Sequence, residues 1–256
     1  MNRIYLFLLF SITLTAYSQI KYEKYLFIRG TDTIPYKLMR PEKKFSEKKL
    51  PLIIFFHGAG ERGNDNERQT ILGIDKLFAD SVTRNNFPCY VIAPQCPRDK
   101  KWADMDWTKI IHEQTTKATP PMSLTHKLAD SLKKILNIDT TKIYVTGLSM
   151  GGFGTWDYCA RYPGEVAAAV PVCGGYDVKA VGKMKAIPFW VFHGDADKLV
   201  KIENARQMVD ALKKLKANVK YSELPGLGHG AWTEAYKDDS ILKWMFQFST
   251  NSKKKK

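Results

Sequence analysis

The sequence predicts an α/β fold, a mostly parallel, twisted sheet of about eight strands with helices on both faces. Two observations favour this fold. Short apolar runs typical of buried strands alternate along the chain with longer segments of helical spacing, and the run 52–56 is apolar throughout, as central parallel strands are. The expected strands are 52–56, 142–146, 188–192 and 219–224, and the expected helices include 123–136, 152–162 and 203–215.

Turn-forming residues separate these elements. Strand 142–146 follows Asp139-Thr140-Thr141, which we expect to form a turn, and helix 152–162 ends before Pro163-Gly164. A polar turn at 41–49 precedes the core strands, and no internal repeat or Pro/Gly/Ser-rich linker divides the chain. The sequence therefore predicts one domain, residues 19–256, that ends in a short basic tail at 251–256.

The segment Gly147-Leu148-Ser149-Met150-Gly151 lies between an expected strand and an expected helix. A Gly-x-Ser-x-Gly sequence in this context is typical of the sharp turn that exposes a nucleophilic serine. Glycines on both sides of Ser149 are needed because the turn brings neighbouring backbone so close that a Cβ would clash. Ser149 is therefore the candidate nucleophile.

A serine hydroxyl needs a base and an orienting carboxylate, and after this type of turn the acid precedes the histidine in the chain. Two of the five histidines follow Ser149. His229 comes after the acidic loop that ends strand 188–192 and is the candidate base, whereas His193 precedes that loop and is expected to be structural. The acid candidates are Asp195 and Asp197, with Asp177 as a remoter one.

Acyl transfer also needs backbone donors for the oxyanion. The candidates are the amide of Ala59, in the glycine-containing loop after strand 52–56, and the amide of Met150, at the start of the helix after the serine. His57 precedes the serine in the chain, so we expect it to hold this loop in shape. The polar run 61–66 that continues the loop is either a solvated turn or a braced rim of the pocket.

The chain resembles secreted esterases of the α/β-hydrolase fold that are related to feruloyl and acetylxylan esterases, a group also described as phospholipase/carboxylesterase-like proteins or predicted peptidases. The resemblance extends from about residue 36 to residue 248, and the motifs that carry it are 57–66, 93–97 with Trp102, 147–156 and 171–175. The pattern His-Gly-x-x-Asp-x-x-Val at 193–200 implies that Asp197 is the acid and that Asp195 braces the loop. The resemblance thus implies a serine carboxylic-ester hydrolase with Ser149, Asp197 and His229 as catalytic residues.

The resemblance further implies substrates that carry acyl groups, acetyl or feruloyl, on carbohydrate. Candidate substrate-binding residues are Trp102 and Trp107, in an aromatic and acidic insertion at 97–122, and Trp232, close to His229 in the chain. Packing of the insertion is the alternative role of Trp102 and Trp107. The alternative functions are a serine peptidase similar to prolyl oligopeptidases, which usually carry a large accessory domain, and a non-catalytic glycan-binding homologue.

The N-terminus has the pattern of a secretory signal peptide, with a basic start, an apolar stretch at 4–15 and small residues before Gln19. We expect residues 1–18 to be removed and the protein to be secreted or periplasmic, with an uncleaved membrane anchor as the alternative. No other apolar run approaches the length of a membrane span, so no membrane insertion is expected after cleavage.

Composition bears on the remaining classes of function. The Cys/His spacing of metal sites is absent from the sequence, and neither a metal nor another cofactor is expected. The net charge of +14 comes without a basic helix or a nucleic-acid-binding motif, so it predicts a solvated surface that attracts acidic polysaccharide and no nucleic-acid partner. The four cysteines are expected to be buried thiols, with a Cys89–Cys96 disulfide as the alternative.

Overall fold

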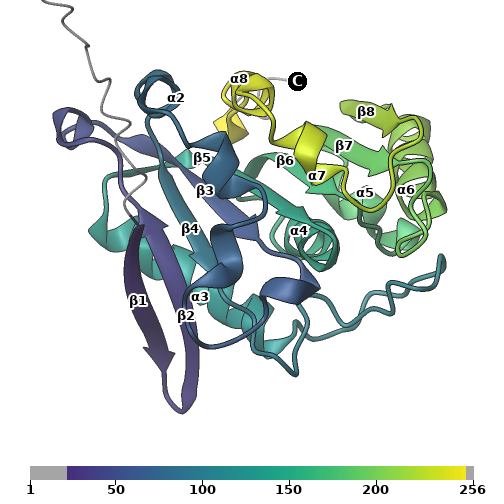
Figure 1. Cartoon of the computed structure of the whole chain (residues 1–256), viewed down its shortest axis with the longest axis horizontal. Coiled ribbons are helices and arrows are strands. Elements are labelled where there is room, and N and C mark those ends of the chain that lie inside the picture. Colours follow the sequence, from purple (N-terminus) through teal and green to yellow (C-terminus); the bar gives the residue numbers. More distant parts are fainter. Residues whose placement is uncertain (1–21, 252–256) are drawn as a thin grey trace, which may run out of the picture.

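The computed structural model of the chain describes residues 22–251 and consists of a twisted sheet with helices on both faces (Figure 1). Among these residues the sheet has eight strands in the order β1-β2-β4-β3-β5-β6-β7-β8. Strands β3 to β8 are parallel, whereas β2 pairs antiparallel with both β1 and β4. The predicted α/β fold with a mostly parallel sheet is confirmed. The predicted signal peptide, 1–18, and residues 252–256 of the basic tail lie outside the described residues.

The elements have the following bounds. The strands are β1 (Tyr22–Arg29), β2 (Asp32–Met39), β3 (Leu50–Phe56), β4 (Tyr90–Pro94), β5 (Ile138–Leu148), β6 (Val166–Val172), β7 (Phe189–Gly194) and β8 (Val219–Leu224). The α-helices are α1 (Ile74–Leu77), α2 (Ser81–Asn86), α3 (Pro120–Ile135), α4 (Met150–Arg161), α5 (Val181–Met184), α6 (Glu203–Lys214), α7 (Trp232–Ala235) and α8 (Ser240–Met245). Within residues 22–251, no helix has the length and hydrophobicity that crossing a bilayer requires.

Each strand and helix named from the sequence is present, but the boundary of one strand was wrong. The segment 139–141, predicted to be a turn, belongs to β5, which begins at Ile138. The Asp139 carboxylate accepts hydrogen bonds from the amide of Thr141 at 3.0 Å and from its hydroxyl at 2.7 Å. The pairing with β3 shifts register at this point. The polar residues that suggested a turn therefore form their local hydrogen bonds inside an irregular stretch of strand.

Two clusters of buried side chains, one on each face of the sheet, form the core. Helices α3, α4 and α6 contribute Leu128, Trp156 and Leu212 to one cluster. On the opposite face, α1 and α8 contribute Leu77 and Ile241 to the other (Figure 1). Burial of each large apolar side chain stabilises the fold by about 1.5–3 kcal/mol, so the sheet is a rigid base for the loops at its edges.

The connection between β4 and α3, residues 95–119, contains neither helix nor strand and extends past α4 (Figure 1). Helix side chains hold it in place: Asn204 of α6 donates to the Lys109 carbonyl at 3.1 Å, and Arg161 of α4 donates to the Thr115 carbonyl at 3.0 Å. Near its two ends, the Thr119 hydroxyl donates to the Trp102 carbonyl at 2.7 Å. We call residues 103–118, which lie between these two positions, the insertion loop.

All four cysteines are buried free thiols, and the alternative Cys89–Cys96 disulfide is not formed. Burial raises the pKa of Cys96 to about 12, and burial together with the charge of Asp197 raises that of Cys173 to about 12. These thiols are therefore protonated at neutral pH and are not nucleophilic thiolates.

Candidate active site

Ser149 lies at the turn between β5 and α4 in a strained backbone conformation, with φ 55° and ψ −120°. Its amide donates a hydrogen bond to the Val172 carbonyl at 2.9 Å, which fixes the turn to β6. A Cβ added to Gly151 would lie 1.9 Å from the carbonyl oxygen of Phe56, and one added to Gly147 would lie 2.6 Å from the same atom. The predicted reason for the two glycines is therefore confirmed, because α4 and β3 approach too closely for a side chain.

The structure brings Ser149, His229 and Asp197 together from three separate loops. His229 Nε2 lies 2.8 Å from Ser149 Oγ, and His229 Nδ1 lies 2.7 Å from Asp197 Oδ2. A carboxylate can only accept, so the proton of the neutral imidazole is on Nδ1 and the lone pair on Nε2 faces the serine hydroxyl. This geometry is the one in which a histidine can take the proton of a serine.

Asp197 is buried and accepts hydrogen bonds on both oxygens. Its Oδ1 accepts from the amides of Leu199 at 2.9 Å and Val200 at 3.0 Å, while Oδ2 faces His229. Burial by itself raises the Asp197 pKa, but hydrogen bonds from His193, His229 and the Val200 amide hold it well below its usual range. The side chain is therefore an ionised carboxylate at neutral pH.

The other two acid candidates lie in different surroundings. Asp195 accepts the amide of Gly226 at 2.7 Å, which links its loop to the loop that carries His229. Asp177 accepts the amides of Lys179 at 2.8 Å and Gln114 at 2.9 Å. Both carboxylates thus brace backbone, and Asp197 is the one that reaches the imidazole of His229.

The loop after β3 is held in shape by the buried side chain of His57. His57 Nε2 accepts the amide of Cys96 at 2.9 Å, so the ring proton is on Nδ1, 2.6 Å from the Gly58 carbonyl. Burial lowers the pKa of His57 to about 4, so the ring is neutral at pH 7. These contacts give His57 the loop-holding position expected from the sequence.

The polar run 61–66 is braced rather than loosely solvated, and the bracing residue is the buried Gln95. Its amide nitrogen donates to the Glu61 carbonyl at 3.1 Å and to Asp65 Oδ1 at 2.8 Å, while its oxygen accepts the Asn66 amide at 2.7 Å. Glu61 is also buried, which raises its pKa, and its Oε2 has no hydrogen-bond partner in the part of the chain that the structure describes. Of the two alternatives, the structure therefore shows the braced rim.

A cavity of about 570 Å³ opens beside Ser149 and His229, within the size range of small-molecule sites. Trp232 forms part of its wall and meets the His229 ring edge-on, with the ring centroids 5.3 Å apart. Trp107, from the insertion loop, also lines it. The other lining residues are Gly58, Ala59, Gly60, Glu61, Leu72, Thr108, Leu148, Lys198, Leu199, Val200 and Lys201.

The two candidate oxyanion donors lie at the ends of elements next to Ser149. Ala59 begins the short 3-10 turn that follows β3, and it lines the cavity. Met150 is the first residue of α4, where a backbone amide has no acceptor within the helix. Both positions agree with the loop and the helix start expected from the sequence.

Trp102 does not line the cavity, so its expected contact with substrate was wrong. The side chain is fully buried, packs edge-on against Phe56 with centroids 4.9 Å apart, and donates to the His57 carbonyl at 3.0 Å. The sequence showed two tryptophans close together in one insertion and gave no sign of which one faces inward. Trp102 is part of the support of the loop after β3.

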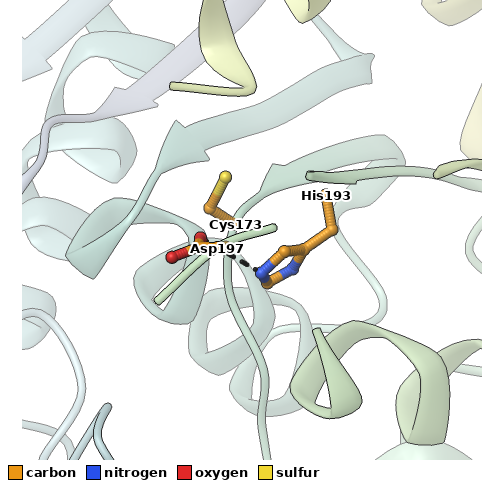
Figure 2. Close-up of side chains that lie close together, drawn as sticks. All are labelled: Cys173, His193 and Asp197. Carbon is orange, nitrogen blue, oxygen red and sulfur yellow. Dashed lines mark ion pairs between the residues drawn. The ribbon is translucent and has the colours of Figure 1, made fainter. Parts of the chain in front are cut away.

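Cys173 and His193 lie beside Asp197 at the ends of β6 and β7 (Figure 2). His193 Nε2 lies 2.8 Å from the Val200 carbonyl, an acceptor, and therefore carries a proton; the same nitrogen is 3.3 Å from Asp197 Oδ2. The three side chains are close enough together to ligate a metal ion. However, Asp197 and His193 are already engaged with His229 and Val200, so we assign this cluster to the support of the carboxylate.

Sequence reasoning did not identify several residues of the cavity wall. Leu72 comes from the segment before α1, while Lys198, Leu199 and Lys201 come from the turn between β7 and α6. Leu72 carries no motif. The position of the other three directly after Asp197 was a signal that could have placed them near the site.

Residues 43–240 match the phospholipase/carboxylesterase family over most of the chain. The chain belongs to this family. It therefore has the fold of the α/β-hydrolase superfamily, and the resemblance drawn from its motifs is confirmed.

Two solved structures are similar to this member of the phospholipase/carboxylesterase family. The crystal structure of a thermostable esterase is 35% identical, with a TM-score of 0.82, over 89% of this chain and 63% of its own. A structure of a ferulic acid esterase shares the fold at 16% identity, with a TM-score of 0.66, over 89% of this chain and 98% of its own.

Two curated fungal proteins are also similar. A bifunctional acetylxylan esterase/xylanase of Neocallimastix patriciarum is 33% identical over 40% of this chain. An uncharacterized secreted protein of Arthroderma benhamiae is 24% identical over 91% of this chain. The chain spans 14% and 27% of the length of these two relatives, respectively.

Proposed function

We propose that the protein is a secreted serine esterase that removes acyl groups, acetyl or feruloyl, from carbohydrate through an acyl-enzyme on Ser149. The observation that carries the proposal is the continuous hydrogen-bonded path from Ser149 Oγ through His229 to Asp197 Oδ2 beside an open cavity. Membership in the carboxylesterase family supports the reaction type. The names of the acetylxylan esterase and ferulic acid esterase relatives support the substrate class.

In the first half of the reaction, His229 Nε2 takes the proton of the Ser149 hydroxyl while Oγ attacks the ester carbonyl carbon. The ionised Asp197 stabilises the imidazolium that forms, and it keeps the Nδ1 proton directed away from the serine. The Ala59 and Met150 amides stabilise the oxyanion, and each such donor contributes on the order of 3 kcal/mol. His229 then protonates the departing alcohol oxygen as the carbon–oxygen bond of the ester breaks.

In the second half, a water molecule takes the place of the alcohol. His229 accepts a proton from this water as its oxygen attacks the acyl carbon. Collapse of the second tetrahedral intermediate breaks the bond to Ser149 Oγ and returns the proton from His229 to the serine. The products are a carboxylic acid and an alcohol, and the resting hydrogen-bonded arrangement is restored.

Two aromatic side chains support a carbohydrate or aromatic acyl substrate. Trp107 and Trp232 both line the cavity, and indole faces stack well on sugar rings and on aromatic acyl groups. Trp232 is fixed by its edge contact with His229, so a substrate stacked on it lies next to the base.

The first test is Ser149→Ala assayed with p-nitrophenyl acetate. We expect specific turnover to fall by a factor of roughly 10⁶, as for loss of other serine nucleophiles, with no loss of folded structure. Labelling by a fluorophosphonate is expected in the wild type and absent in the variant. Activity of Ser149→Ala near the wild-type level would refute the assignment of the nucleophile.

The second test addresses substrate and location. A panel of acetylated xylan, methyl ferulate and p-nitrophenyl esters of increasing chain length is expected to give the highest kcat/KM with a carbohydrate ester or a ferulate. Fractionation of cells that express the full chain is expected to place the processed protein outside the cytoplasm. Preference for long-chain p-nitrophenyl esters would overturn the carbohydrate-ester proposal but not the serine mechanism.

A further inference from the structure

Two lysines line the cavity that contains Ser149 and His229. Lys198 and Lys201 belong to the turn between β7 and α6, and both are exposed. Neither ammonium group has a hydrogen-bond or ion-pair partner among residues 22–251, although many other lysines of the chain are paired with carboxylates. The wall of the cavity therefore presents two unneutralised positive charges to whatever enters it.

The lysines are held close to the site by the same turn that positions Asp197. Lys198 follows Asp197 directly, and the amides of the next two residues, Leu199 and Val200, donate to Asp197 Oδ1 at 2.9 and 3.0 Å. The carbonyl of Val200 is in turn 2.8 Å from His193 Nε2. Because the backbone on both sides of the turn is bonded in this way, the two lysine side chains start from fixed points near the reacting groups.

Among the residues that line the cavity, no exposed carboxylate offsets the charge of these lysines. Glu61 is the one acidic residue among those that line the cavity; it is buried, its pKa is raised by burial, and its Oε2 faces protein rather than solvent. Asp197 does not line the cavity and is already bonded to His229 and to two backbone amides. Among the side chains that line the cavity, the exposed charges are therefore those of Lys198 and Lys201.

We propose that Lys198 and Lys201 form a subsite for an anionic group, a carboxylate, carried by the ester substrate near its scissile bond. This inference rests on the proposed esterase function and narrows its substrate class to acidic esters. A carboxylate on either half of the ester, the acyl group or the alcohol, has the chemistry that two ammonium groups recognise. Long-range attraction by the net charge of +14 would add to the local effect, so a test must separate the two.

The test uses pairs of substrates that differ only in charge. Ethyl hydrogen succinate and ethyl succinamate place a carboxylate or its neutral amide isostere on the acyl side. Acetoxyacetate and acetoxyacetamide do the same on the alcohol side. For each pair, the measured quantity is the anionic-to-neutral ratio, which is kcat/KM for the anionic ester divided by kcat/KM for the neutral ester. This ratio is measured at low and high NaCl concentration in the wild type, in Lys198→Gln, in Lys201→Gln and in the double variant.

The matched control is Lys213→Gln/Lys214→Gln, which removes the same charge from exposed positions at the C-terminal end of α6. This end of the 12-residue helix is about 18 Å from its start next to the cavity. The control therefore reports the effect of net charge alone, and thermal melting of all variants confirms that they are folded.

We expect each of Lys198→Gln and Lys201→Gln to lower the anionic-to-neutral ratio by about two- to fivefold for at least one pair, the worth of an exposed charge pair. The wild-type ratio is expected to fall as NaCl screens the lysines. The pair that responds identifies the half of the ester that carries the carboxylate.

An equal fall in the control, or a ratio that is unchanged in the double variant for both pairs, would overturn the subsite while leaving the esterase function intact. Failure of the wild type to hydrolyse any of the four esters or p-nitrophenyl acetate would overturn the proposed function and the subsite together.

Discussion

Substitution of Gly151 by alanine tests the close contact between α4 and β3 that shapes the serine turn. The added Cβ would lie 1.9 Å from the Phe56 carbonyl oxygen, 2.5 Å from its carbonyl carbon and 2.8 Å from the His57 carbonyl oxygen. All three atoms belong to the backbone, so no side-chain rotation can relieve the overlap. Restoring an ordinary contact requires α4 and β3 to separate by about 1.5 Å, in an interior packed as tightly as a crystal.

This separation affects both stability and activity. We expect the overlap with backbone to lower the free energy of unfolding by about 3 kcal/mol, the upper end of the range for overpacked cores. This corresponds to a fall in Tm of roughly 6–12 °C for a chain of this size. The displaced elements carry Met150 on one side and lead into Ala59 on the other, so both proposed oxyanion donors move. A displacement of about 1 Å at a catalytic group lowers kcat by roughly 100-fold.

The assay compares thermal melting and p-nitrophenyl acetate turnover of Gly151→Ala with those of Gly182→Ala. Gly182 lies in α5, where an added Cβ meets nothing within 4 Å. Because alanine favours helix over glycine by about 1 kcal/mol, Gly182→Ala is expected to keep or slightly raise Tm and to leave kcat unchanged. If Gly151→Ala behaved like Gly182→Ala in both measurements, the role assigned to the close approach of α4 and β3 would be wrong.

Two further predictions concern the groups around Asp197 and a surface ion pair. His193→Leu is expected to lower kcat by about 10-fold with little change in KM, because it removes the N–H group that donates to the Val200 carbonyl and lies beside Asp197. His193→Gln is expected to restore part of the lost kcat. Equal effects on KM and kcat would contradict this role of His193. Hydrogen bonding to His126 and the charge of Lys133 lower the pKa of Glu165 from 4.5 to about 2. The pairing therefore stabilises the folded state above pH 4.5, and this stabilisation is lost as the pH falls toward 2. The Tm difference between wild type and Glu165→Gln should therefore shrink between pH 6 and pH 3, and a constant difference would refute the assigned pairing.

The strands and the serine turn were predictable because their signals are local. The apolar run at 52–56 and the glycines around Ser149 each describe their own surroundings, and the structure has β3 and the strained turn at these positions. The acid was harder to choose, because Asp195 and Asp197 are two residues apart on one loop. The resemblance at 193–200 implied Asp197, and the folded loop has Asp197 Oδ2 directed at His229 while Asp195 reaches Gly226.

The cavity wall was less predictable because it is formed by loops that are distant in the chain. Leu72, Trp107 and Lys198 come from three connections, and no short-range pattern links them. The erroneous placement of Trp102 has the same origin. Trp102 and Trp107 are five positions apart in a segment without regular structure, so no helical or strand periodicity indicates which of the two faces the core.

The insertion loop is closed at its base, where the Thr119 hydroxyl bonds to the Trp102 carbonyl and the Trp102 indole is anchored beneath His57. Beyond that closure the loop supplies Trp107 and Thr108 to the cavity and nothing to the path from Ser149 to Asp197. The length and the aromatic residues of this stretch can therefore change without altering the hydrogen-bonded path from Ser149 to Asp197. A loop grafted between Trp102 and Thr119 would replace part of the cavity wall and leave the sheet in place, which on the proposed function changes the esters that are accepted.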